Sequence, residues 1–148
     1  MTLVRRGPTV GPPISLELEI PLHDVDLLHV VWHGHYAKYL EIGSTALLRS
    51  RQLDVKDCME MGYRLVVIDW RCRYVFPLRY RDRLRVEAWF SDVDNRIAIG
   101  YELTNLTHGR RCARANTTLV TTDANGTLFY ETPAELVGRI RGPVAAPG

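Results

Sequence analysis

Residues 35–51 read HYAKYLEIGSTALLRSR and carry the one long helical pattern of the 148-residue chain. Six of these residues recur at the spacing of one helix face: Tyr36, Tyr39, Leu40, Gly43, Ala46 and Leu47. Ile42 and Leu48 lie outside this stripe, so most of the circumference is apolar. A helix that is apolar nearly all round is a buried helix, and we expect the rest of the chain to cover this one.

Short alternating segments on both sides of this helix predict strands. In the first, Ile14, Leu16, Leu18 and Ile20 alternate with polar residues, and four more segments follow at 64–76, 83–90, 96–104 and 111–122. The short links DVDN, THG and DANG indicate an antiparallel sheet, because parallel strands need crossovers of about a dozen residues or more. A short helix near 53–61 and a proline-led helix at 133–140 complete the pattern.

The order of these elements predicts an α+β fold in which one antiparallel sheet wraps around one long helix. The expected domain covers residues 14–141, with flexible tails at 1–13 and 142–148. A single open sheet leaves an edge strand unpaired, so we expect a homodimer or a homotetramer.

The composition argues against several classes of protein. Nineteen basic and seventeen acidic residues give a net charge of +2, too small to favour nucleic acid or a membrane as partner. Three separated cysteines without a C-x-x-C pair argue against a disulfide framework and indicate the cytoplasm. The sequence has no apolar run of the ~18 residues that span a membrane. It also lacks the G-x-S-x-G, Walker and dinucleotide motifs.

Residues 23–36, HDVDLLHVVWHGHY, hold four of the five histidines and two aspartates at the junction of the first strand and the long helix. A partly apolar loop can desolvate a carboxylate there. The start of the helix offers unpaired N–H groups and a positive dipole end, which can stabilise a developing oxyanion. A base or nucleophile beside such donors is what acyl transfer requires.

This segment contains D-x-D, an apolar loop, a tyrosine ten residues after the second aspartate, and then Y-x-x-Y-L-E. The pattern resembles the 4-hydroxybenzoyl-CoA thioesterase-like acyl-CoA thioesterases, which have the hot-dog fold. The resemblance extends from Ile14 to about Ile140 and includes a strand region ending YVFPLRYRDRLRVE. It implies a hydrolase that cleaves the thioester of an acyl-CoA or an acyl carrier protein, without a metal or other cofactor.

The resemblance also implies roles for individual residues. Asp26 would attack the thioester carbonyl or activate water, with Asp24 in support. The backbone N–H of His33 would donate to the thioester oxygen, and its side chain could assist the thiolate or orient water. Tyr36 matches a tyrosine of the family, whereas His35 stands where asparagine or serine is usual.

Other side chains are candidates for binding the substrate. Trp32 could line the channel for the acyl group or pantetheine, or it could be a core aromatic. Arg73 and Arg81 belong to a series of arginines between 71 and 85 that could bind phosphates of coenzyme A or the acidic face of a carrier protein. A solvated outer sheet face explains these arginines equally well. Met59, Met61 and Tyr63 could shape an acyl tunnel or simply pack in the core.

Two departures from the family pattern concern the loop and the helix. Leu28 and His29 stand where the family has glycine, so the loop lacks the residue that adopts a positive φ at least cost. Ser44 replaces an arginine three residues after Glu41. We expect the chemistry to persist and the choice of substrate to differ.

The same residues allow three other functions. Asp26, His29, His33 and His35 could hold zinc or iron. Asp26 with His29 or His33 could be the acid–base pair of a hydratase or dehydratase acting on acyl thioesters. In a non-catalytic domain that binds acyl thioesters or is purely structural, Asp26 would be a loop residue that caps the helix.

Overall fold

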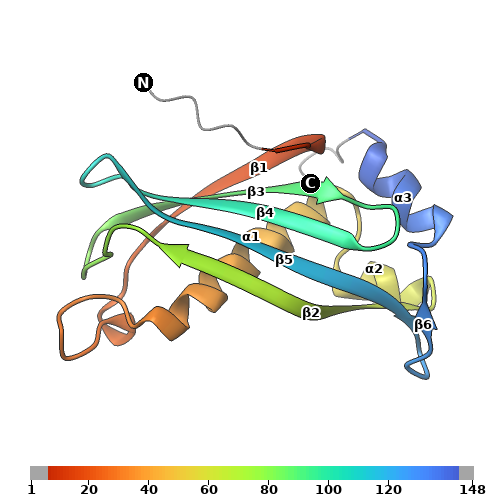
Figure 1. Cartoon of the computed structure of the whole chain (residues 1–148), viewed down its shortest axis with the longest axis horizontal. Helices are drawn as coiled ribbons and strands as arrows, with labels where there is room; N and C mark the ends of the chain where they lie inside the picture. The colour runs from red at the N-terminus through yellow and green to blue at the C-terminus, as the bar shows by residue number, and fades with distance from the viewer. Residues whose placement is uncertain (1–6, 144–148) are drawn as a thin grey trace.

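The computed structural model describes residues 7–143, which form one antiparallel sheet with a long helix across one face (Figure 1). The strand order is β1-β3-β4-β5-β2, and the short β6 pairs with β5 off this path. The strands are β1 (Val10–Glu19), β2 (Tyr63–Tyr74), β3 (Arg83–Asp92), β4 (Ile97–Asn105), β5 (Arg110–Asp123) and β6 (Leu128–Phe129). The prediction of one antiparallel sheet around one long helix is confirmed.

Helix α1 (Tyr36–Ser50) is the predicted long helix, and five of its residues are buried: Tyr36, Tyr39, Leu40, Gly43 and Leu47. Gly43 allows a close approach to β3, because a Cβ at this position would lie 2.8 Å from Val86 Cγ1. The sequence predicted a helix covered nearly all round, but Ile42 is 40% exposed. The reason is that the sheet covers only one face of α1 (Figure 1).

Strand β1 begins at Val10, four residues before the predicted start at Ile14. The pairing of β1 with β3 shifts register between these two residues, and Gly11 adopts a φ of +72°. Residues 10–13, which we expected in a flexible tail, therefore belong to the sheet. Residues 1–6 and 144–148 of the two predicted tails lie outside the described residues.

Two shorter helices flank one end of α1. Helix α2 (Val55–Glu60) begins after Asp54, whose side chain forms a capping box with Asp57. Helix α3 (Ala134–Arg141) buries Leu136 and Ile140. Arg51, just after α1, is 2% exposed and donates to Pro12 O (2.7 Å) and Ile140 O (3.3 Å), so it joins α1 to β1 and α3.

Strand β2 forms one edge of the sheet (Figure 1). Its pairing with β5 shifts register between Val67 and Asp69. Four apolar side chains of β2 are 42–55% exposed: Val66, Val67, Ile68 and Trp70. Apolar side chains and free backbone groups thus share this edge, which is the usual signature of a strand that pairs with another chain. In residues 7–143, no helix has the length and apolar character needed to cross a membrane.

Candidate active site

The segment between β1 and α1 folds as a narrow hairpin. Asp26 N donates to Val30 O (2.9 Å), and Trp32 N donates to Asp24 O (3.1 Å). At the tip, His29 adopts a φ of +64°, so a histidine takes the left-handed conformation that glycine adopts at least cost. The hairpin therefore forms without the glycine that the family pattern has at this turn.

A cleft of about 340 Å³ lies between this hairpin and the end of β2. Asp26, His33, Tyr36 and Tyr74 contribute to its lining. Asp26 is half-buried, and its Oδ1 accepts a hydrogen bond from Leu28 N at 2.8 Å. This bond fixes the orientation of the carboxylate at the wall of the cleft.

His33 begins the 3₁₀ turn η2 (His33–His35) that leads into α1. As the first residue of the turn, it has no acceptor within the turn for its N–H. Tyr74 holds this turn in place, because its hydroxyl donates to His33 O at 2.9 Å. The Tyr74 ring also packs edge-on against Tyr36, with 4.7 Å between ring centroids. Asp26 and His33, the first residue of the helical segment, thus line the same cleft.

Tyr74 was not selected from the sequence, where it was one of the alternating apolar residues of a strand. Its signal was weak because the strand and the loop that it joins are 41 residues apart. Burial, followed by the neighbouring Cys72 thiol, raises the pKa of Tyr74 to about 12. Its hydroxyl therefore remains a hydrogen-bond donor at neutral pH.

Asp24 belongs to a second cluster, on the same hairpin. Its side chain is 1% exposed and accepts hydrogen bonds from Tyr39 OH (2.7 Å), Lys38 Nζ and His23 Nδ1 (3.1 Å). His35 Nδ1 lies 3.9 Å from the same carboxylate. Burial would raise the pKa of Asp24, but the hydrogen bonds from Lys38 and Tyr39 outweigh burial and lower this pKa below its ordinary value.

The other candidates lie apart from the cleft. The Trp32 ring contacts the rings of His33 and His35 at 5.3 and 5.4 Å between centroids, and Trp32 is 48% exposed. Arg73 lines a separate groove beside β4 and β5. Arg81 is in the β2–β3 loop, with its Nε 3.4 Å from Glu19 Oε1. The structure thus brings together Asp26, His33 and Tyr36.

The metal hypothesis required Asp26 and three histidines to converge. His35 instead lies beside Asp24. In residues 7–143, no three histidine, cysteine, aspartate or glutamate side chains come together in the way that a metal site requires.

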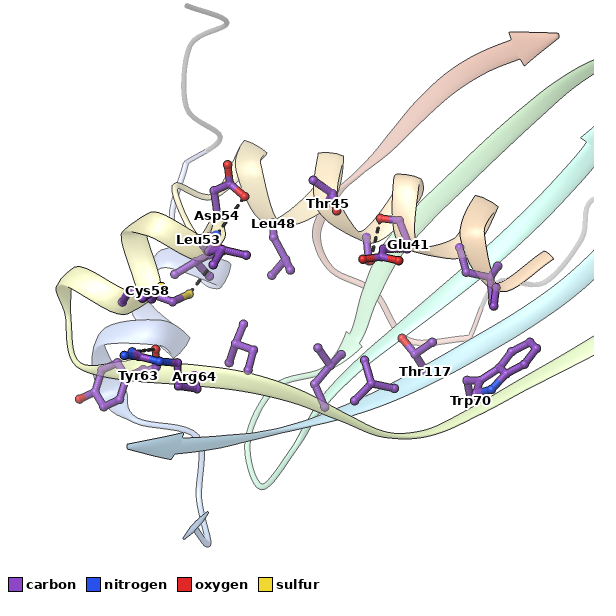
Figure 2. A pocket seen from close by; sticks show the side chains of 18 of the residues that line it. Glu41, Thr45, Leu48, Leu53, Asp54, Cys58, Tyr63, Arg64, Trp70 and Thr117 are labelled. Carbon is purple, nitrogen blue, oxygen red and sulfur yellow. Dashed lines mark hydrogen bonds between the residues drawn. The ribbon is translucent and has the colours of Figure 1, made fainter. Parts of the chain in front are cut away.

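A second cavity, of about 430 Å³, lies between α1, α2 and β2 (Figure 2). Its α2 end is mostly apolar, with Leu48, Leu53, Cys58, Met59 and Tyr63 in the lining. Near Trp70, the lining includes Glu41 and Thr117, and Thr117 Oγ1 lies 2.9 Å from Tyr101 OH. This volume and the apolar walls are typical of a pocket for a small organic group.

Comparisons with known proteins agree with this geometry. Residues 20–140 match the model of the thioesterase-like superfamily. The chain is 28% identical over 90 residues to YneP of Bacillus subtilis, which is assigned as an acyl-CoA thioesterase; the match covers 60% of this chain and 65% of YneP, just under two thirds. It is also 28% identical over 121 residues to an assigned esterase of Synechocystis, covering 80% of this chain and 73% of that protein.

Solved structures share the fold. A 1,4-dihydroxy-2-naphthoyl-CoA thioesterase from Synechocystis aligns with a TM-score of 0.74 at 20% identity, over 87% of this chain and 96% of the other. A substituted 4-hydroxybenzoyl-CoA thioesterase, solved with 4-hydroxybenzoyl-CoA, aligns with a TM-score of 0.76 at 19% identity, over 86% of this chain and 98% of the other. The hot-dog fold predicted from the sequence is confirmed. The chain belongs to the thioesterase-like superfamily.

Proposed function

We propose that this protein hydrolyses the thioester of an acyl-CoA or an acyl carrier protein, with Asp26 as nucleophile or general base. The observation that carries the proposal is the shared cleft, which is lined both by the half-buried Asp26 and by His33, the first residue of the segment leading into α1. Membership in the thioesterase-like superfamily supports the same reaction. The family resemblance itself assigned these roles to Asp26 and to the N–H of His33.

Asp26 can act in either of two ways, as a general base or as a nucleophile. As a base, Asp26 takes a proton from water while the water oxygen bonds to the thioester carbon, and the carbonyl oxygen becomes an oxyanion. The His33 N–H donates to this oxyanion, and the C–S bond then breaks to give the acid and a thiol that receives the proton. As a nucleophile, the carboxylate displaces the thiolate and water hydrolyses the resulting anhydride.

We further propose that two copies of the chain pair through β2. The exposed apolar residues of this edge strand support the proposal. Around a two-fold axis, paired antiparallel strands place the Tyr74 end of one β2 beside the Tyr63 end of the other. Because Tyr74 lines the cleft and Tyr63 lines the 430 Å³ cavity, the cleft of one copy would face this cavity of the other, which would then hold the acyl group. Gel filtration with light scattering tests this: Ile68→Lys, in mid-strand, should give monomers, whereas a dimeric variant would contradict the pairing.

The carrier, the assembly and the location complete the proposal. Arg73 and Arg81 are exposed, so phosphates of coenzyme A or an acidic carrier protein can reach both. The pairing through β2 gives a homodimer, and two such dimers could form a homotetramer. Three free cysteines, Cys58, Cys72 and Cys112, support a cytoplasmic location.

The test is release of free thiol from a panel of acyl-CoAs, aromatic to long-chain, and from acylated carrier protein. The wild type is compared with Asp26→Asn and with Asp94→Asn, an exposed aspartate between β3 and β4 that serves as the matched control. Loss of a general base typically costs about 10²–10⁴-fold, so Asp26→Asn should lose nearly all turnover while the control keeps it. Turnover should survive a chelator. A folded Asp26→Asn protein with wild-type turnover would refute the role of Asp26, and no release from either carrier would refute the hydrolase.

A further inference from the structure

We propose that the ion pair between Lys38 and Asp24 sets the position of the His33 N–H relative to Asp26, which makes Lys38 a positioning residue for the reaction. The inference rests on the proposed function for its catalytic consequence. Lys38 belongs to the first turn of α1, and its Nζ donates to the nearly fully buried Asp24 carboxylate. Neither residue needs to touch the substrate for this role.

The Lys38–Asp24 ion pair joins the two ends of the hairpin between β1 and α1. Asp24 ends the 3₁₀ turn η1 (Leu22–Asp24), just before the hairpin, and Lys38 and Tyr39 follow it in α1. Oδ1 of Asp24 accepts from Lys38, whereas Oδ2 accepts from Tyr39 OH at 2.7 Å. One carboxylate is thus held by two donors from the same helix turn, 14 and 15 residues further along the chain.

The backbone transmits this anchorage to the reacting groups. Asp24 O accepts a hydrogen bond from Trp32 N at 3.1 Å, and Trp32 immediately precedes His33. On the other strand of the hairpin, Asp26 is only two residues from Asp24, and its N–H bonds to Val30 O at 2.9 Å. A shift of Asp24 relative to α1 would therefore change the separation of Asp26 and the His33 N–H.

Charge makes Lys38 the important member of the pair. A carboxylate that is 1% exposed needs a cation or several donors to remain ionised without a large desolvation cost. Lys38 is 43% exposed, so its aliphatic chain is not part of the core. Removal of its charge should leave the fold intact and loosen the start of α1. Misplacement of reacting groups by 1 Å costs about 10²-fold in rate, so even a small shift should be measurable.

The chain offers its own control, because Lys38 and Lys56 are its only lysines. Lys38→Met removes the charge, Lys38→Arg restores a charged donor, and Lys56→Met makes the same change on exposed α2. We expect Lys38→Met to lower kcat about tenfold or more with KM within about twofold. We expect Lys38→Arg to recover most of the loss and Lys56→Met to match the wild type. Wild-type kcat in Lys38→Met, a change in KM alone, or no recovery in Lys38→Arg would overturn the proposal.

A second readout does not depend on turnover. In hydrogen–deuterium exchange, Lys38→Met should speed exchange in residues 31–37 and leave β4 at the wild-type rate. Unchanged exchange in residues 31–37 would show that the Lys38–Asp24 ion pair does not hold this segment in place. If the wild type released no thiol from any substrate, the proposed hydrolase function would be refuted. The exchange data would still decide whether the Lys38–Asp24 ion pair holds residues 31–37 in place.

Discussion

Replacement of Tyr74 by phenylalanine isolates the hydrogen bond to His33 O, the residue whose N–H we propose as the oxyanion donor. The substitution removes the hydroxyl that donates to His33 O at 2.9 Å. It keeps the ring that packs against Tyr36 at 4.7 Å and against His33 at 6.3 Å. The aromatic contacts should therefore survive, and η2 should lose one of its tethers to the sheet.

The size of the effect follows from the energy of one hydrogen bond. Such a bond contributes about 0.5–1.5 kcal/mol net. If all of it serves to hold the donor in the transition state, kcat should fall between about twofold and about twelvefold, because each 1.36 kcal/mol corresponds to a factor of ten in rate. KM should change little, since the bond is made before substrate binds.

The assay is steady-state thiol release, with Tyr80→Phe as control because this tyrosine is 51% exposed in the β2–β3 loop. The pKa of Tyr74 is raised to about 12, so Tyr74 stays a donor across the usual assay range and should add no break to the pH profile of the wild type. A loss of a hundredfold or more would mean that the hydroxyl contacts the substrate. Wild-type kcat would mean that the tether to His33 does not affect catalysis.

Three further predictions concern stability. Because the pKa of Asp24 is lowered from its ordinary value of 3.8, its ionised carboxylate stabilises the fold at pH values above 3.8, and this contribution is lost as the pH falls further. Asp24→Asn should therefore have a lower Tm than the wild type at pH 7, and the difference in Tm should shrink below pH 4. A difference in Tm that does not change with pH would contradict this. Arg51→Met should cost about 3 kcal/mol, or roughly 6–12 °C in Tm, because the buried carbonyl of Ile140 and the partly buried carbonyl of Pro12 lose their donor. An unchanged Tm would show that both carbonyls find other partners. Gly43→Ala should lower the free energy of unfolding, measured by denaturant titration, by about 1–3 kcal/mol, because its Cβ would lie 2.8 Å from Val86 Cγ1. Gly138→Ala in α3 is the control: its Cβ would meet nothing within 4 Å, so it should raise the free energy of unfolding by about 0.5–1 kcal/mol. Equal effects of the two substitutions would contradict the close packing at Gly43.

Periodicity gave the fold because each element has a clear local signature. The stripe of α1 and the alternation of β3 and β4 reflect burial on one face, which the sequence records directly. The prediction failed where the chain departs from regular geometry. The early start of β1 depends on a register shift between Val10 and Ile14, and the exposed apolar residues of β2 depend on its place at the sheet edge. Neither feature has a local pattern of its own.

The site shows the same division between local and distant causes. Asp26 and His33 could be selected because they lie in one short segment with a recognisable spacing. Tyr74 and Lys38 could not, since their partners are 41 and 14 residues away and become neighbours only when the sheet and α1 pack together. The sequence also grouped Asp24 and Asp26 as one motif, whereas folding places them in different surroundings.

This difference between the two aspartates separates a structural role for Asp24 from the proposed reactive role of Asp26. The pKa of the buried Asp24 is lowered by the donors that bind it, so its carboxylate remains charged and engaged with α1 at neutral pH. Such a group is a poor nucleophile, because its oxygens are already occupied by hydrogen bonds. Asp26, two residues away, is half-buried at the cleft with one oxygen on Leu28 N. Because the two aspartates have different surroundings, Asp24→Asn and Asp26→Asn should have different effects. Asp24→Asn should lower Tm and slow turnover, whereas Asp26→Asn should abolish turnover in a protein of normal stability.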